Sequence, residues 1–165
     1  MHDDVKMTDQ RAKTCCFTGH RLIAAADRPL LRPRLREEIL LCYGRGVRNF
    51  GTGGALGFDM LAAEEVLSLR ESECPDARLI LVLPCRNQAD RWSAADREHY
   101  AAILAAADKV VYTSDAYFNG CMQKRNRHLV DCSGHCIAYL THDFGGTAYT
   151  VRYAMESGLS VSIIP

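Results

Sequence analysis

Short apolar segments alternate with longer amphipathic segments along most of the chain. Six of the apolar segments are four to six residues long and stop at glycine, proline or polar residues, which is typical of buried strands. These segments are residues 14–18, 47–51, 78–83, 109–113, 136–140 and 161–164. Helix-forming residues between them predict helices over residues 29–43, 57–70, 88–107, 120–132 and 147–157.

This alternation of strand and helix indicates consecutive βαβ units. We therefore expect an α/β fold, a three-layer sandwich with a mainly parallel sheet flanked by helices on both faces. A chain of 165 residues suits one domain, which we expect to span residues 14–165 after a disordered lead-in over residues 1–13. Ligands of such sheets bind beyond the carboxyl ends of the strands, so functional residues are expected in the segments that follow the strands.

Composition narrows the range of partners. Twenty basic and twenty acidic residues give a formal net charge of zero, so a broad electrostatic footprint for duplex nucleic acid is not expected, with a local basic groove left open. The chain contains no apolar run that could span a membrane. The N-terminal segment lacks the apolar core of a signal peptide, so we expect a cytoplasmic protein, with a homo-oligomer left open.

The eight cysteines include no CxxC pair, which predicts mostly buried, reduced thiols. Cys132, His135 and Cys136 lack a fourth ligand, so neither a metal site nor a cofactor is expected.

The first predicted strand is followed by a polar turn made of Thr18, Gly19, His20 and Arg21. Glycine permits a tight turn, and the arginine and histidine side chains can both hydrogen-bond a phosphate. A plain turn with a solvated arginine is the alternative. The position directly after a strand favours ligand binding.

The second predicted strand runs through a glycine-rich segment, GTGGALG, into a helix. Gly53, Gly54 and Gly57 would let the backbone approach a ligand at a helix N-terminus, where free N–H groups favour an anion. Asp59 in the first helical turn is expected either to compensate the helix dipole or to hold a ribose hydroxyl. Glu64 lies deeper in the helix, where a solvated or capping role competes with a catalytic one.

Further candidates follow the later strands. Pro84 ends the third predicted strand, and Tyr117, after the fourth, is a candidate for stacking on a nucleobase. Arg125 and Asn126 belong to a basic run that is either a solvated helix face or part of the ligand edge. A second glycine-rich helix start follows the fifth strand and consists of Gly145, Gly146 and Thr147. Two such helix starts in one sheet together predict a ligand that carries phosphate.

These motifs together resemble the SLOG superfamily, a Rossmann-like group that includes the DNA-processing protein DprA and the LOG phosphoribohydrolases. The resemblance is strongest to its YpsA-like branch, a largely uncharacterised bacterial family. It rests on the sequences FTGHR (17–21), GGALGFDMLAAEEV (53–66), LILVLPCRNQADRW (79–92), QKRNRHLVDCS (123–133) and the later GGT, and it covers nearly everything from residue 14 onward. It implies a nucleotide-derived ligand along the strand ends, with the glycines of residues 53–57 at its phosphate.

The resemblance also bears on catalysis. Arg125 stands where the catalytic arginine of LOG enzymes would, and the later Gly-Gly-Thr resembles their second motif. The glutamate expected after the threonine is missing, because the chain continues with Ala148, Tyr149 and Thr150. A nucleoside 5′-monophosphate N-glycosidase would therefore need Asp59 or Glu64 as its acid.

Three functions are thus expected in descending order. The first is a sensor or ligand-processing domain that binds a nucleotide-derived or other phosphate-bearing small molecule. The second is a nucleoside-phosphate glycosidase of the LOG type. The third is a single-stranded nucleic-acid binder like DprA, which a formal net charge of zero disfavours.

Overall fold

The computed structural model describes residues 9–164, in which six strands alternate with five helices. The strands are β1 (Thr14–Gly19), β2 (Asn49–Thr52), β3 (Arg78–Leu83), β4 (Lys109–Tyr112), β5 (His135–Tyr139) and β6 (Ser160–Ile164). The helices are α2 (Arg28–Gly44), α3 (Phe58–Arg70), α4 (Ala94–Ala106), α5 (Cys121–Asp131) and α6 (Gly145–Glu156).

The largest differences from the predicted boundaries lie before β1 and at the start of α4. Residues 9–12, within the lead-in that the sequence predicted as disordered, form a helical turn before β1, and residues 1–8 lie outside the described part of the chain. Helix α4 begins at Ala94 rather than at residue 88. The side chain of Ser93 accepts a hydrogen bond of 3.1 Å from the backbone N–H of Asp96, and this N-cap fixes the start of the helix.

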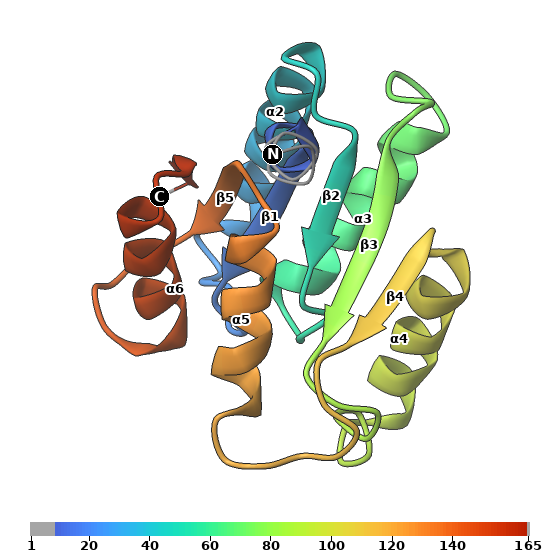
Figure 1. The fold of residues 1–165 in the computed structure, drawn as a ribbon. Helices are drawn as coiled ribbons and strands as arrows, with labels where there is room; N and C mark the ends of the chain where they lie inside the picture. Colours follow the sequence, from blue (N-terminus) through green and yellow to red (C-terminus); the bar gives the residue numbers. More distant parts are fainter. Residues whose placement is uncertain (1–8, 165) are drawn as a thin grey trace.

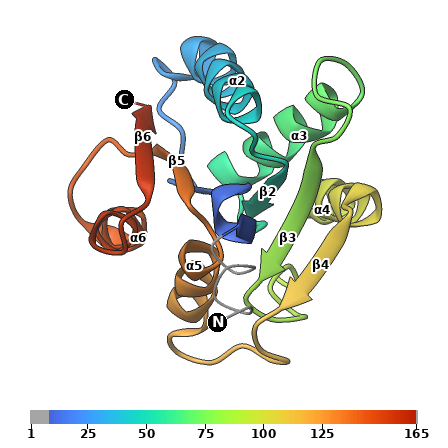
Figure 2. The same ribbon diagram turned by 45° about the horizontal axis from the view of Figure 1, so that its top comes forward.

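All strand pairs are parallel, and the strand order is β4-β3-β2-β1-β5-β6. Helices α2, α3 and α4 cover one face of the sheet, and α5 and α6 cover the other, as both views show (Figures 1 and 2). The expected three-layer α/β fold is confirmed. The strand order reverses between β1 and β5, which are neighbours in the sheet although more than a hundred residues separate them in sequence. In this class of fold a ligand crevice is expected at that reversal.

Alternate residues of β1 supply the two halves of the core. Cys15 and Phe17 pack in a cluster with the buried faces of α2, α3 and α4, while Cys16 packs with Cys136 against α5 and α6. This division follows from the two-residue period of a strand whose two faces are both covered. Seven of the eight cysteines are buried, all eight are free, and the exposed one is Cys132.

Within residues 9–164, none of the helices combines the length and the hydropathy that a bilayer crossing needs. The same range contains no cluster of three His, Cys, Asp or Glu side chains arranged to hold a metal ion.

Candidate functional site

A pocket of about 290 Å³ lies at the reversal of strand order, where the segments after β1 and β5 meet the starts of α3 and α5. Ten of the sequence-predicted residues line it: Thr18, Gly19, His20, Arg21, Asp59, Arg125, Asn126, Gly145, Gly146 and Thr147. Five further residues complete the lining, and sequence reasoning did not select them: Phe17, Ala55, Met122, His142 and Phe144.

The guanidinium of Arg125 is the buried basic group of the pocket. The residue is only 4% exposed. Its Nη1 donates to the carbonyl oxygen of Gly53, its Nε donates to Oδ1 of Asn126 at 2.7 Å, and its Nη2 lies 3.7 Å from Sδ of Met122. Among the ion pairs of residues 9–164, none involves Arg125. The pocket therefore contains a buried cation without a carboxylate in direct contact.

Asp59 is the buried acid of the same pocket. Its Oδ2 accepts the backbone N–H of Ala55 at 3.2 Å, and its own carbonyl oxygen accepts the hydroxyl of Thr52 at 3.1 Å. Burial raises the pKa of Asp59, while the charge of Arg125 and the Ala55 hydrogen bond act in the opposite direction. Burial likewise lowers the pKa of Arg125, and Asp59 partly offsets that shift. One carboxylate oxygen thus fixes the loop before α3, and the residue also faces the pocket.

Close backbone contacts join the loop after β1 to the start of α3. The backbone N–H of Phe58 donates to the carbonyl oxygen of His20 at 3.2 Å. Gly57 has a φ of +83°, and a Cβ there would overlap the backbone of Arg21. These contacts place Arg21 and the segment 53–57 at the same edge of the sheet, as the sequence predicted.

The glycines of the first glycine-rich segment serve packing inside the protein. A Cβ on Gly53 would overlap the guanidinium of Arg125, and one on Gly54 would lie 2.6 Å from Cδ2 of Leu83. Gly53, Gly54 and Gly57 are not among the described residues that line the pocket, whereas Ala55 is. Their effect on a ligand is therefore indirect, through the position of Arg125 and of the loop.

The second glycine-rich segment is open to the pocket. Neither Gly145 nor Gly146 would bring an added Cβ within 4 Å of another group. Phe144, the N-cap residue of α6, makes no side-chain cap hydrogen bond. Free N–H groups in the first turn of a helix favour an anion, and here they adjoin the pocket that holds Arg125.

Three aromatic rings form a stack on the pocket wall. The ring centroids of His20 and His142 are 4.1 Å apart with an interplanar angle of 13°, and those of His142 and Phe144 are also 4.1 Å apart. Nε2 of His20 accepts the backbone N–H of Thr141 at 3.0 Å. Burial, with a smaller contribution from His142, lowers the pKa of His20. The sequence held one signal for this feature, an aromatic residue directly before a glycine pair in a loop after a strand.

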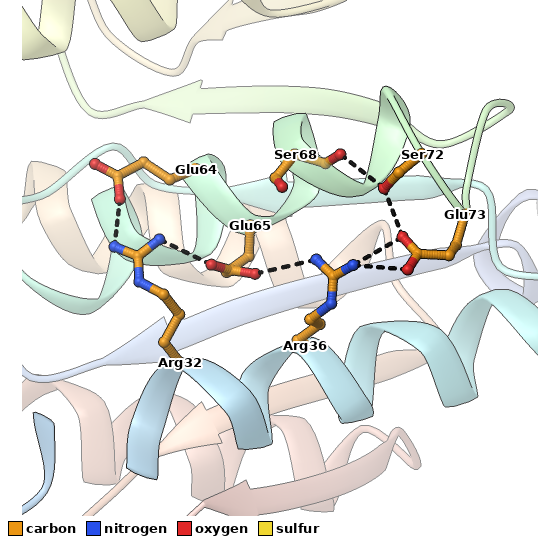
Figure 3. A network of polar contacts seen from close by, with 7 residues as sticks. All are labelled: Arg32, Arg36, Glu64, Glu65, Ser68, Ser72 and Glu73. Carbon is orange, nitrogen blue, oxygen red and sulfur yellow. Dashed lines mark hydrogen bonds and ion pairs between the residues drawn. The ribbon is translucent and has the colours of Figure 1, made fainter. Parts of the chain in front are cut away.

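Three predicted residues lie away from the pocket. Glu64 accepts a hydrogen bond of 2.7 Å from Arg32 of α2 (Figure 3). It is also paired with His99 of α4, so it belongs to a network that joins three helices rather than to the pocket. Pro84, the residue directly after β3, is buried and does not line the pocket. Tyr117 is 63% exposed, and its backbone N–H donates to Asn87 at 3.2 Å. The carboxylate of Glu64 therefore faces α2 and α4 rather than the pocket.

A parallel sheet with a polar pocket at its reversal of strand order defines a Rossmann-like α/β protein. The family model described as the YspA SLOG family, named YpsA, matches residues 24–160. The chain therefore belongs to the YpsA family of SLOG proteins, as its motifs predicted. A UPF0398 protein of Halalkalibacterium halodurans is 30% identical over 129 residues, which are 76% of this chain and 68% of that protein.

Two solved structures share the fold. DNA processing protein A of Helicobacter pylori, described as binding single-stranded DNA, superposes with a TM-score of 0.65 at 20% identity, covering 98% of this chain and 69% of that one. DNA processing protein A of Streptococcus pneumoniae superposes with a TM-score of 0.67 at 18% identity, covering 92% of this chain and 50% of that one. The chain thus spans about two thirds of the Halalkalibacterium relative and half of the Streptococcus protein.

Proposed function

We propose that the protein binds a nucleotide-derived or other phosphate-bearing small molecule in this pocket, as a sensor or ligand-processing domain. The observation that carries the proposal is the guanidinium of Arg125, which is 4% exposed and forms no ion pair among residues 9–164. A buried charge is costly unless a partner compensates it. Asp59 compensates this charge only in part and without direct contact, and an anionic ligand would supply a direct partner.

The surroundings of Arg125 support phosphate as the anion. Arginine presents a planar set of donors that matches phosphate oxygens, and the first turn of α6 adds backbone N–H groups at the same pocket. The volume of about 290 Å³ is at the lower end of small-molecule sites. The proposal therefore concerns one small ligand rather than a strand of nucleic acid.

Isothermal titration with inorganic phosphate and with nucleoside monophosphates tests this proposal. Arg125→Met keeps much of the side-chain length but removes the charge, and a charge-assisted hydrogen bond contributes about 1.5–3 kcal/mol. We therefore expect the substitution to weaken binding by about 10- to 150-fold. The matched control is Arg127→Met on the exposed side of the same helix. Equal binding by Arg125→Met and wild type, with both folded, would refute the proposal.

A second candidate function is hydrolysis of the glycosidic bond of a nucleoside monophosphate. The observation that favours it is Asp59, a buried pocket acid whose pKa is raised. The positions after Thr147 offer no acid, because Ala148, Tyr149 and Thr150 carry no carboxylate. The hydroxyl of Thr150 bonds to the carbonyl oxygen of Gly146 in its own helix at 2.8 Å. Free base released by wild type but not by Asp59→Asn, followed by chromatography, would support hydrolysis. We expect little or no release of free base, because the carboxylate of Asp59 already accepts the backbone N–H of Ala55.

A further inference from the structure

The aromatic stack on the pocket wall ends in an exposed ring. His20, His142 and Phe144 follow one another with centroid separations of 4.1 Å, and the outer ring, Phe144, is 69% exposed although it lines the pocket. Each neighbour thus covers one face of the His142 ring, whereas the outer face of Phe144 remains open. An additional flat ring could continue it.

The inner ring of the stack, His20, is held in place by a hydrogen bond to the backbone and by packing. His20 accepts the backbone N–H of Thr141 at 3.0 Å and packs edge-on against the buried ring of Tyr139, with centroids 5.5 Å apart. An acceptor nitrogen is unprotonated, so this hydrogen bond fixes His20 as a neutral imidazole. A stack anchored at His20 is a suitable support for an aromatic ligand, because an anchored side chain loses little entropy on binding.

The position of Phe144 has no evident role in folding. It is the N-cap residue of α6, where serine, threonine, aspartate or asparagine would stabilise the helix by accepting an N–H hydrogen bond, and it makes no such bond. Its ring also stays largely outside the core. A large apolar side chain at a capping position, exposed beside a polar pocket, is explained by contact with a ligand.

We propose that Phe144 is a stacking platform for a nucleobase, so that the ligand is a single nucleoside monophosphate with its phosphate at Arg125 and the start of α6. This inference rests on the proposed function and adds the base to it. Phe144 directly precedes Gly145 and Gly146 of the α6 N-terminus. One ligand that carries both an aromatic base and a phosphate would therefore contact Phe144 and the start of α6 at the same time. A pocket of about 290 Å³ suits one nucleotide better than two.

The experiment compares ribose 5-phosphate, which lacks a base, with adenosine, guanosine, cytidine and uridine 5′-monophosphates by isothermal titration. Stacking of a base on an aromatic side chain contributes a factor of about 5 to 150 in affinity. We expect wild type to bind at least one nucleotide more tightly than ribose 5-phosphate by a factor in that range. Phe144→Ala should abolish the difference without weakening ribose 5-phosphate, and Phe144→Trp should retain it.

Tyr117→Ala is the matched control, because Tyr117 is similarly exposed but does not line the pocket. It should leave both affinities unchanged, and circular dichroism should show every variant folded. Nucleotides that bind wild type no more tightly than ribose 5-phosphate would overturn the stacking proposal while the proposed function stands. A loss of ribose 5-phosphate affinity in Phe144→Ala would also overturn it, since the residue would then shape the loop. Failure of wild type to bind any of the probes would overturn both proposals.

Discussion

Replacing Gly53 by alanine introduces one methyl group at the point where the pocket meets the β2–α3 loop. The added Cβ would overlap the guanidinium of Arg125, whose Nη1 donates to the carbonyl oxygen of the same glycine. Because a long side chain can move more easily than backbone, we expect the guanidinium to shift away. The hydrogen bond to Gly53 is then lost, and the charge leaves its position in the pocket.

The expected loss of stability follows from three contributions. Breaking a hydrogen bond to a charged group costs about 1.5–3 kcal/mol, and crowding a packed site costs about 1–3 kcal/mol. Alanine also restricts the unfolded chain, which returns about 0.4–1 kcal/mol. The net destabilisation is about 2–5 kcal/mol, and less if movement of the side chain relieves most of the crowding. A domain of this size is typically stable by about 5–15 kcal/mol, so the variant should still fold.

Urea denaturation measures this effect, with the fluorescence of Trp92, the only tryptophan, as the signal. Trp92 packs against Tyr100 with ring centroids 5.1 Å apart and does not line the pocket. The control is Gly146→Ala in α6, where an added Cβ meets no group within 4 Å, so its stability should be unchanged or higher by about 0.5–1 kcal/mol. Wild-type stability together with wild-type phosphate affinity in Gly53→Ala would refute the reasoning.

Three further predictions concern other parts of the molecule. Glu65 is buried and pairs with Arg32 at 2.8 Å and with Arg36 at 3.8 Å (Figure 3), so Glu65→Ala should destabilise the protein by about 1–3 kcal/mol in urea denaturation. A thiol titration of the native protein should find one accessible cysteine, Cys132, and slow reaction of the seven buried ones; fast modification of most thiols would contradict the observed burial. Burial lowers the pKa of His20 in the folded protein, so the unfolded chain binds a proton more readily. The stability that this pKa difference contributes above about pH 6.5 is therefore lost as the pH falls toward the lowered pKa. Thermal unfolding at about pH 7.5 and 5.5 should therefore show a smaller loss for His20→Asn than for wild type.

Most of the fold could be predicted from the sequence because strand and helix periods differ and buried parallel strands are nearly continuous apolar runs. The strand Arg78–Leu83 was predicted with both ends correct. The predicted start of α4 is too early because glutamine and alanine before Ser93 are good helix formers. Their helix propensity outweighed the N-cap signal of Ser93. Placing functional residues after strands brought ten predicted residues to one pocket, since parallel strands end at one edge of the sheet.

The side chains that face the pocket could not be predicted with the same success. Glu64 and Asp59 lie on the same helix, and only the relative positions of α2, α3 and α4 decide that Glu64 faces Arg32 while Asp59 faces the pocket. His142 and Phe144 were not selected because an aromatic residue in a loop is a weak signal until its neighbours are known. The stack depends on His20, which comes from a loop more than a hundred residues earlier in the chain.

The two glycine-rich helix starts looked equivalent in sequence, yet their surroundings differ in a way that bears on ligand binding. At Gly53 and Gly57 an added side chain would overlap the protein itself, so glycine is required there by packing whether or not a ligand binds. At Gly146 an added side chain would meet nothing within 4 Å; the same space is open at Gly145, but the backbone φ of +89° there itself favours glycine. At Gly146, where neither packing nor a positive φ requires it, glycine in the first turn of a helix lowers helix stability. Under the proposed function, this glycine beside the buried Arg125 leaves space for an anion, which makes the α6 start the stronger candidate for the phosphate.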